Sequence, residues 1–345
     1  MRRTHRSVAL VATGLVLASV TSGCSFLGLG KKPADLQVYS ARHYGSEAVF
    51  KQFTKETGIT VSFLGGENSE LLQRIKAEGK SSPADLFVTV DAGNLYEAAR
   101  EGLLAPVDNA KLDAEIPAEY RDKENRWFGL VSRARTVLYD PDKVKPSEFD
   151  AKDTYAGLAD PKWKGKLCMR DESEAYQVAL VAHLINLYGE AKATQIVKGW
   201  VANKPQIMAN DKLLIDAVDA GTCDVALVNH YYVAGELEDS PHLDVKLYWA
   251  SQKGAGTMVN ISGAGVVKTS DNKADAEKLL EWLAARSGQA AMASGNHEFP
   301  VNPAVKPDAE AAQWGTFKPA PLQADELGQQ EQKAVEILDA VGYGR

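Results

Sequence analysis

Short apolar runs alternate along the chain with stretches whose apolar positions recur at helical spacing. Apolar runs predict strands over 36–40, 59–64 and 84–90, and the stretches between and after them predict helices over 46–57, 69–78 and 95–100. Ser46 is the expected N-cap of the first of these helices, and Gly58, Gly79 and Gly102 follow their ends. Strands that alternate with helices are typical of parallel βαβ units.

The alternation breaks off between residues 106 and 126, which are expected to be surface connections. Two extended runs at 127–131 and 135–139 then lead out of the first unit. Further strands are predicted over 167–169, 223–228 and 245–249, with helices over 174–188, 191–202 and 213–220. The run 258–267 is a second crossing, and helices over 274–285 and 325–341 complete the pattern.

A chain that leaves one α/β unit, builds a second and returns has two lobes joined by two crossings. We expect lobe I to comprise residues 36–134 and 257–303, and lobe II to comprise residues 135–256 and 304–345, with the last helix on lobe II. A cleft between two lobes is a common place for a ligand, and hinge closure can enclose it there.

Composition supports a globular chain without a nucleic-acid partner. The 345 residues are 45% hydrophobic and 25% charged, as in ordinary soluble proteins, and the length suggests two domains of ~150 residues. Removal of residues 1–23 takes away three arginines and no acid, so the net charge of −7 becomes −10. Such an acidic chain lacks the basic surface that DNA or RNA requires.

The first 23 residues are predicted to be a signal peptide, and Cys24 follows directly. Arg2, Arg3 and Arg6 precede an apolar stretch over 8–18 that is too short to span a membrane as a mature helix. This order resembles a bacterial lipoprotein signal, which implies lipidation of Cys24, a tether over 24–35 and an extracytoplasmic protein anchored to a bacterial membrane. An ordinary cleaved signal is the alternative. No later run is long enough to be transmembrane.

The two remaining cysteines, Cys168 and Cys223, lie in or beside predicted strands of the second lobe. An exported chain meets an oxidising environment, so we predict one disulfide between them. Two buried free thiols are the alternative. No cysteine or histidine spacing in the chain indicates a zinc site.

The run Asn229-His230-Tyr231-Tyr232 follows the buried strand that ends at Val228. In α/β sheets, ligands bind outside the carboxyl ends of strands, which is where this tyrosine pair falls. A phenolate is a hard anionic oxygen and suits a small, highly charged cation such as ferric iron. Taken alone, the pair also fits one core tyrosine and one loop tyrosine.

Six ordered motifs resemble the ferric-ion-binding proteins of bacterial ABC iron importers, most closely their cyanobacterial-type, tyrosine-rich subgroup. The motifs are LQVYSARHY at 36–44, SPADL at 82–86, SRAR at 132–135, DPKWKGK at 160–166, NHYY at 229–232 and SGAGV at 262–266. They extend over nearly all of the chain after residue 35. The resemblance implies a two-lobed type II periplasmic-binding-protein fold, no enzymatic activity, and a monomer that delivers Fe(3+) to an ABC permease.

The resemblance also implies that tyrosine oxygens in the interlobe cleft hold the metal. Residues matching the family's ligand positions are Tyr44, Tyr176, Tyr231 and Tyr232. His43 either ligates through a ring nitrogen or orients Tyr44. The other branch of the family uses a glutamate just after the third strand, where this chain has Val90 or its neighbour Asp91. The tyrosine-rich version fits better, because Tyr44 and Tyr176 are both present.

Neighbouring residues have open roles at this stage. Arg135 is either a cation that balances phenolate charge beside the metal or a surface arginine near the hinge. We expect His230 to point away from the pair, because neighbours on an extended chain face opposite sides, and His183 to lie in the core. Glu67, Asn68 and Ser69 belong to a loop that can line the cleft.

Two other classes of function compete with iron binding. A binding protein of the same fold can take a non-metal ligand such as a polyamine or an organic anion, and fold alone does not separate these cargoes. The chain has no GxSxG, HExxH, Walker or dinucleotide motif that would indicate an enzyme.

Overall fold

The structure, a computed structural model, describes residues 34–42, 45–149, 153–171, 175–321 and 324–345. Of the residues discussed above, Cys24, His43 and Tyr44 lie outside these ranges.

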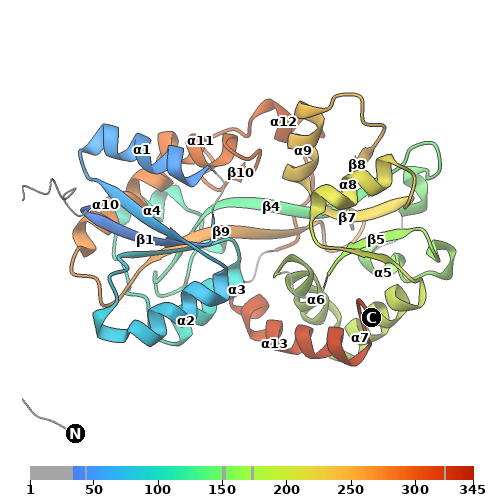
Figure 1. Cartoon of the computed structure of the whole chain (residues 1–345), viewed down its shortest axis with the longest axis horizontal. Helices are drawn as coiled ribbons and strands as arrows, with labels where there is room; N and C mark the ends of the chain where they lie inside the picture. Colours follow the sequence, from blue (N-terminus) through green and yellow to red (C-terminus); the bar gives the residue numbers. More distant parts are fainter. Residues whose placement is uncertain (1–33, 43–44, 150–152, 172–174, 322–323) are drawn as a thin grey trace, which may run out of the picture. The chain divides into compact units, whose positions relative to one another are not determined.

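The described residues form a sheet of ten strands (Figure 1). The strands are β1 Leu36–Ser40, β2 Val61–Gly65, β3 Leu86–Thr89, β4 Phe128–Tyr139, β5 Leu167–Arg170, β6 Gln206–Met208, β7 Val225–Asn229, β8 Lys246–Tyr248, β9 Met258–Val266 and β10 Phe299–Pro300. Their order is β2-β1-β3-β9-β4-β7-β5-β6, and β8 and β10 both pair with β4.

The pairing directions divide the sheet into two parallel groups joined by antiparallel strands. Strand β1 is parallel to β2 and β3, and β5 is parallel to β6 and β7, which confirms the predicted parallel units. Strands β9 and β4 pair antiparallel with each other, and they pair antiparallel with β3 and β7 respectively. The two long strands therefore connect the two groups, as Figure 1 shows.

Strand β4 is longer than the sequence pattern indicates. The two predicted extended runs are one strand of 12 residues, all of them buried. The polar residues Ser132, Arg133 and Arg135 interrupt the apolar pattern, yet they lie inside the strand because buried partners take up their hydrogen bonds.

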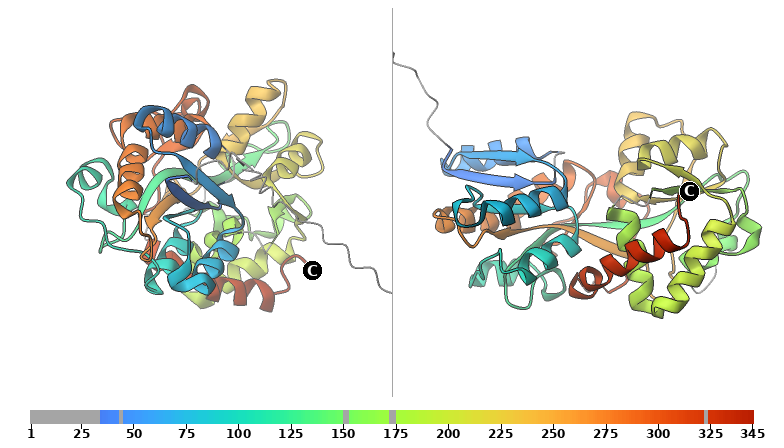
Figure 2. Two further views of the ribbon diagram at one scale, coloured as in Figure 1. Left: turned by 60° about the vertical axis from the view of Figure 1, so that its left-hand side comes forward. Right: turned by 60° about the horizontal axis from the view of Figure 1, so that its bottom comes forward.

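Thirteen α-helices of the described residues cover the sheet (Figures 1 and 2). They are α1 Ser46–Thr57, α2 Asn68–Glu78, α3 Ala92–Arg100, α4 Ala110–Glu115, α5 Thr154–Gly157, α6 Ala175–Tyr188, α7 Glu190–Ala202, α8 Asp211–Asp219, α9 His230–Asp239, α10 Lys273–Ala284, α11 Arg286–Ser294, α12 Ala309–Ala312 and α13 Ala324–Ala340. None of the helices in the described part is both long and apolar enough to cross a membrane.

Several local predictions were wrong. Helix α4 lies within the expected surface connection, where Leu112 and Ile116 are fully buried. Helices α9 and α11 were not expected. Gly45, not Ser46, is the N-cap of α1, since Ser46 is its first residue and donates its hydroxyl hydrogen to the carbonyl oxygen of Arg42.

Separate hydrophobic clusters lie beside the two strand groups. Phe50, Phe53 and Leu279 belong to a cluster around β1, β3 and β9. Trp163 and Trp200 belong to another, around β5, β7 and α6. The second group also contains Cys168 and Cys223, whose sulfur atoms are bonded in the structure, with their Cα atoms 5.8 Å apart.

The last helix, α13, touches both halves of the chain. Its apolar residues Leu327, Ile337 and Leu338 belong to the cluster around α6, and the helix also packs against α3 (Figure 2, right). Just beyond it, the buried Tyr343 donates its hydroxyl hydrogen to the carbonyl oxygen of Arg170 on β5, at 2.8 Å.

Candidate metal centre

The paired tyrosines lie in the first turn of α9. The buried strand β7 ends at Asn229, and α9 begins with His230, Tyr231 and Tyr232. The rings of Tyr231 and Tyr232 have their centroids 4.3 Å apart. A helix start is a favourable place for anionic oxygens, because the unpaired backbone N–H groups there carry partial positive charge.

A third tyrosine meets this pair from another helix. Tyr176 lies near the start of α6, and its hydroxyl oxygen is 3.2 Å from that of Tyr231. Tyr176 and Tyr232 both line a cavity of about 580 Å³. The structure therefore brings together Tyr176, Tyr231 and Tyr232, while Tyr44 and His43 fall outside the described residues.

Two guanidinium groups lie against Tyr176. The guanidinium carbons of Arg133 and Arg170 are 5.3 and 5.6 Å from the centre of its ring. Burial raises the pKa of the Tyr176 phenol to about 12, and the charge of Arg133 opposes that rise. The phenol without a metal is therefore protonated at neutral pH, and the charge of Arg133 favours its ionisation.

Each of these arginines shares a buried carboxylate with a second arginine. Asp211 accepts from Arg170 at 2.7 Å and from Arg135 at 3.3 Å. Glu298, also fully buried, pairs with Arg42 and lies 3.8 Å from Arg133. Asp211 and Glu298 thus hold Arg170 and Arg133 at the Tyr176 ring, and guanidinium groups beside a phenol suit a phenolate oxygen.

The position of Arg135 excludes the surface role considered for it and leaves its role beside the metal a prediction. Its side chain is buried and donates to Asp211 and to the carbonyl oxygen of Leu227, so it is not a surface arginine. The arginines whose guanidinium groups lie over the Tyr176 ring are Arg133 and Arg170. Arg135 reaches the tyrosine region through Asp211, which it shares with Arg170.

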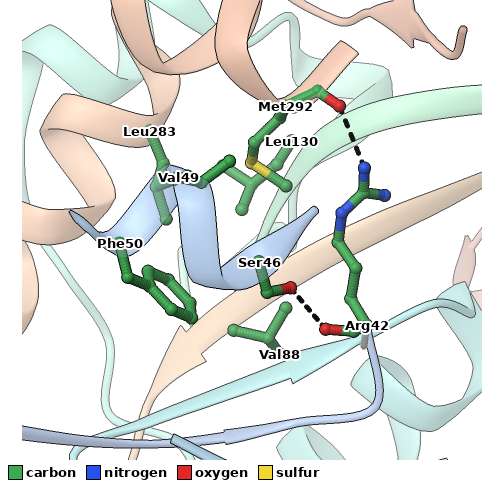
Figure 3. A pocket seen from close by; sticks show the side chains of 8 residues that line it. All are labelled: Arg42, Ser46, Val49, Phe50, Val88, Leu130, Leu283 and Met292. Carbon is green, nitrogen blue, oxygen red and sulfur yellow. Dashed lines mark hydrogen bonds between the residues drawn. The ribbon is translucent and has the colours of Figure 1, made fainter. Parts of the chain in front are cut away.

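Arg42 belongs to the wall of a different, much smaller cavity. Figure 3 shows this space between α1 and α11, where Arg42 donates to the carbonyl oxygen of Met292 at 2.9 Å. The other lining side chains shown are mostly apolar, and the cavity measures about 10 Å³. It is too small and too apolar for a hydrated ion.

His230 was expected to point away from the tyrosine pair, and the structure shows it buried. It is helical rather than extended, so the argument from alternating faces does not apply. Its ring stacks on Phe299 with centroids 4.2 Å apart, and its Nδ1 accepts from the backbone N–H of Ala134. Burial lowers the pKa of His230 to about 3, so the ring is neutral. His183 is also buried, as expected.

Residues on or beside α2, α3 and α13 also line the 580 Å³ cavity. They include Glu67, Asn68, Asn94 and Glu331. Glu67 precedes α2 as its N-cap and Asn68 is the first residue of that helix, whereas Glu331 was not foreseen from the sequence. Its position on a helix far along the chain gave no signal, because only the tertiary packing of α13 brings it to the cavity.

Of the two residues considered for the glutamate position, Val90 lines the cavity, and its neighbour Asp91 binds other groups. One Asp91 oxygen accepts from the backbone N–H groups of Gly93 and Asn94 at 2.7 and 3.2 Å, and the other accepts from Asn260 at 2.7 Å. Asp91 is thus the N-cap of α3.

The described residues contain one further group of potential metal ligands. His297, Asp308 and Glu310 offer atoms within 4.8 Å of one another. Both ring nitrogens of His297 already face carboxylates, Asp308 at 3.0 Å and Glu238 at 3.1 Å. None of these residues lines the tyrosine cavity.

Comparison with known proteins agrees with the resemblance seen in the motifs. A family described as bacterial extracellular solute-binding protein matches residues 81–318. The chain is 36% identical to iron uptake protein A1 of Synechocystis, over 99% of this chain and 98% of that relative. It is 33% identical to the major ferric iron-binding protein of Neisseria meningitidis, over 79% and 82% of the two chains.

A solved structure gives the same fold. The Trichodesmium protein FutA, also called IdiA, in complex with iron and citrate ligands superimposes with a TM-score of 0.83 and 40% sequence identity. The match covers 89% of this chain and 99% of that one. The predicted α/β, two-lobed type II fold is confirmed, whereas the residue boundaries of the lobes stay a prediction.

Proposed function

Because the chain belongs to the bacterial extracellular solute-binding proteins, we propose that it binds ferric iron at Tyr176, Tyr231 and Tyr232 and delivers it to an ABC permease. The observation that carries this proposal is the convergence of three tyrosines from two helices beside the guanidinium groups of Arg133 and Arg170. A core tyrosine cluster would not need two guanidinium groups over one ring.

The chemistry of the donor set fits the cargo. Phenolate oxygens are hard ligands and match a small trivalent cation better than a softer divalent one. Each phenol must lose its proton when iron binds, and the pKa of about 12 at Tyr176 makes that loss unfavourable without the metal. The arginines at 5.3 and 5.6 Å stabilise the phenolate that forms.

The remaining parts of the proposal concern anchoring and closure. The mature protein begins at Cys24 and is held at a bacterial membrane, outside the cytoplasm, by lipid on that residue. Lobe I supplies Tyr44, with His43 as ligand or orienting group, and lobe II supplies the other three tyrosines. The protein acts as a monomer. Its two lobes close around the cargo, since a ligand contacting both lobes favours the closed state.

A second candidate cargo is a ferric ion bound together with a small carboxylate. The cavity of about 580 Å³ is larger than a bare ion requires, and Arg170 and Asn210 line it. The Trichodesmium structure holds both iron and citrate. This candidate uses the same tyrosines and adds an anion beside Arg170.

One titration separates these cargoes. Iron-free protein is mixed with ferric nitrilotriacetate or ferric citrate, and the tyrosinate-to-iron absorption band is recorded with the bound metal and citrate. A band with one iron per chain supports iron binding, and retained citrate supports the second candidate. If calorimetry shows heat of binding with citrate or spermidine alone, and no absorption band forms with iron, the cargo is organic rather than iron.

Closure is tested with Tyr44→Phe. We expect this variant to keep a weaker coloured complex, while iron no longer reduces its radius of gyration in small-angle scattering. Compaction equal to that of the unmodified protein would contradict the proposed division of ligands between the lobes.

A further inference from the structure

Helices α3 and α13 interlock through two glycines. A Cβ atom added at Gly93 on α3 would lie 1.9 Å from a carboxyl oxygen of Glu331 on α13. A Cβ atom added at Gly328 on α13 would lie 2.4 Å from the ring of Tyr96 on α3. Each glycine therefore provides the space that a side chain of the other helix fills.

The carboxyl group of Glu331 faces a second carboxyl group in this contact. Its neighbour is Asp91, because the Glu331 carboxyl lies 1.9 Å from the Cβ position of Gly93, whose backbone N–H donates to Asp91 at 2.7 Å. Asp91 already accepts from the N–H groups of Gly93, Asn94 and Asn260, so a proton between the two carboxyl groups belongs to Glu331. Two neighbouring buried carboxyl groups cannot both ionise without strong repulsion, which favours one shared proton.

The surroundings of Glu331 favour its protonated form. Burial is the largest cause that raises its pKa well above the ordinary value, followed by the charge of Asp91, and Glu97 on α3 adds to it. Lys333, on the same helix, lies 3.4 and 3.6 Å from Glu190 and Glu336 instead.

The cavity and the other packed helices complete this environment. Glu67, Arg170, Tyr176 and Tyr232 line the cavity together with Glu331. From α6, which packs against α13, the titratable side chains besides Tyr176 are His183 and Tyr188, and Tyr188 bonds to Asp153. From α7 they are Glu190, Lys192 and Lys198.

We propose that Glu331 is a positioning residue for the cavity. Protonated Glu331 holds α13 against α3, and loss of the proton releases this contact. Glu331 lines the same cavity as Tyr176 and Tyr232, so release of the contact changes how readily cargo exchanges. The fastening itself does not depend on the identity of the cargo. Its effect on iron exchange rests on the proposed function.

The direction of the pH dependence follows from the raised pKa. A carboxyl group whose pKa is higher in the contact than in the separated helices stabilises the contact fully below its ordinary pKa. This stabilisation is lost as the pH rises through the raised value. The tyrosines must lose their protons to bind iron, and a higher pH favours that loss. Iron is therefore captured under conditions that loosen the contact.

The contact is tested in the iron-free full chain by hydrogen–deuterium exchange of α13 and α3 peptides. The probe variant is Glu331→Gln, which keeps an N–H donor toward Asp91 but does not titrate. The protection of the unmodified protein is divided by that of this variant at the same pH. The intrinsic exchange rate, which itself depends on pH, cancels in this ratio. We expect this ratio of protection, unmodified protein over Glu331→Gln, to be near one in acid. As the pH rises, the ratio should fall by about tenfold for each unit by which the contact raises the pKa of Glu331.

Two further variants keep the test decisive. Glu336→Gln removes an exposed carboxylate of the same helix, 3.6 Å from Lys333, and should leave the ratio at one throughout. Gly93→Ala displaces the Glu331 carboxyl and should loosen the contact at every pH, with circular dichroism confirming the fold. A protection ratio for Glu331→Gln that is constant across the pH series would overturn the proposal.

The effect on cargo is measured separately by stopped-flow formation of the tyrosinate-to-iron band. Glu331→Gln should keep the final band but lose the acceleration that the unmodified protein shows as the pH rises. If no band forms in any variant, the proposed function fails while the exchange result still stands. Equal rates in both proteins at every pH would remove the link between the contact and the cavity.

Discussion

The hydroxyl oxygens of Tyr176 and Tyr231 lie 3.2 Å apart, although 55 positions separate these residues and each belongs to a different helix. When the phenols are protonated, a hydrogen bond joins them. Its hydrogen lies between the two oxygens, at the place that a cation bound by both oxygens would occupy. Iron must replace this hydrogen bond with two metal–oxygen bonds. The pair is thus held close enough to chelate before the metal arrives.

Removal of a single phenol from this group should strongly reduce iron binding. Changes in groups that merely support a metal ligand cost about 10–100-fold in affinity, so Tyr231→Phe, Tyr232→Phe and Tyr176→Phe should each cost at least that much. Competition with a ferric chelator measures the loss. Tyr120→Phe, at a partly buried position outside the cavity lining, is the matched control and should bind normally.

Iron affinity should fall as the pH falls. The pKa of Tyr176 is raised to about 12 by burial, so the phenol is protonated at neutral pH and its proton leaves when iron binds. Each proton released makes the affinity fall by about tenfold per pH unit. Equilibrium dialysis against a chelator of known pH dependence measures the slope, and a slope of zero would exclude tyrosinate as the main ligand.

Loss of the bond between Cys168 and Cys223 should destabilise the protein without abolishing iron binding. The bond closes a loop with a sequence separation of 55, and such bonds contribute about 2–4 kcal/mol. Urea unfolding should give the same loss for Cys168→Ser as for the double serine variant, because either change removes the bond. Additive losses, or two alkylated thiols in the unreduced protein, would indicate free cysteines.

Buried histidines should make the fold sensitive to acid. Burial lowers the pKa of His183 to about 4, so the native ring is neutral. Stability from this group is complete above the unfolded pKa of about 6.5 and is lost as the pH falls toward 4. His183→Phe should therefore show a smaller decrease in melting temperature over this range, whereas His242→Phe, at an exposed position, should match the unmodified protein.

Lipidation is tested by Cys24→Ala in the full chain. Fractionation of the bacterial host should find the unmodified protein with membranes and the variant soluble or unprocessed, since one thioether-linked lipid anchor is missing. Mass spectrometry of the N-terminal peptide should find lipid on Cys24. Membrane association that is the same in both proteins would rule out this anchor.

Much of the fold followed from the apolar pattern, because the inner strands β1, β3, β5 and β7 are almost wholly buried. The runs 36–40 and 223–228 predicted β1 and β7 to within two residues. Helix α9 was missed since its first two residues, His230 and Tyr231, are both buried and its first turn shows no amphipathic spacing. Helix α11 was missed because glycine and serine at its start are poor helix formers.

The site was only partly readable from the sequence. The tyrosines follow from motifs, but the arginines over the Tyr176 ring do not, because Arg133 and Arg135 lie two residues apart on one strand and nothing local separates their roles. Side chains two apart on a strand share a face, so the difference arises from their partners, Glu298 and Asp211. Those partners come from distant parts of the chain.

The hydrogen bond from Tyr343 to the carbonyl oxygen of Arg170 has a consequence for biosynthesis. Residue 343 is translated long after β5, yet its ring is buried against the strand whose arginine lies over Tyr176. A nascent chain whose first lobe has already folded still lacks this support. The strand that places Arg170 over the Tyr176 ring is therefore completed only after residue 343 has been made.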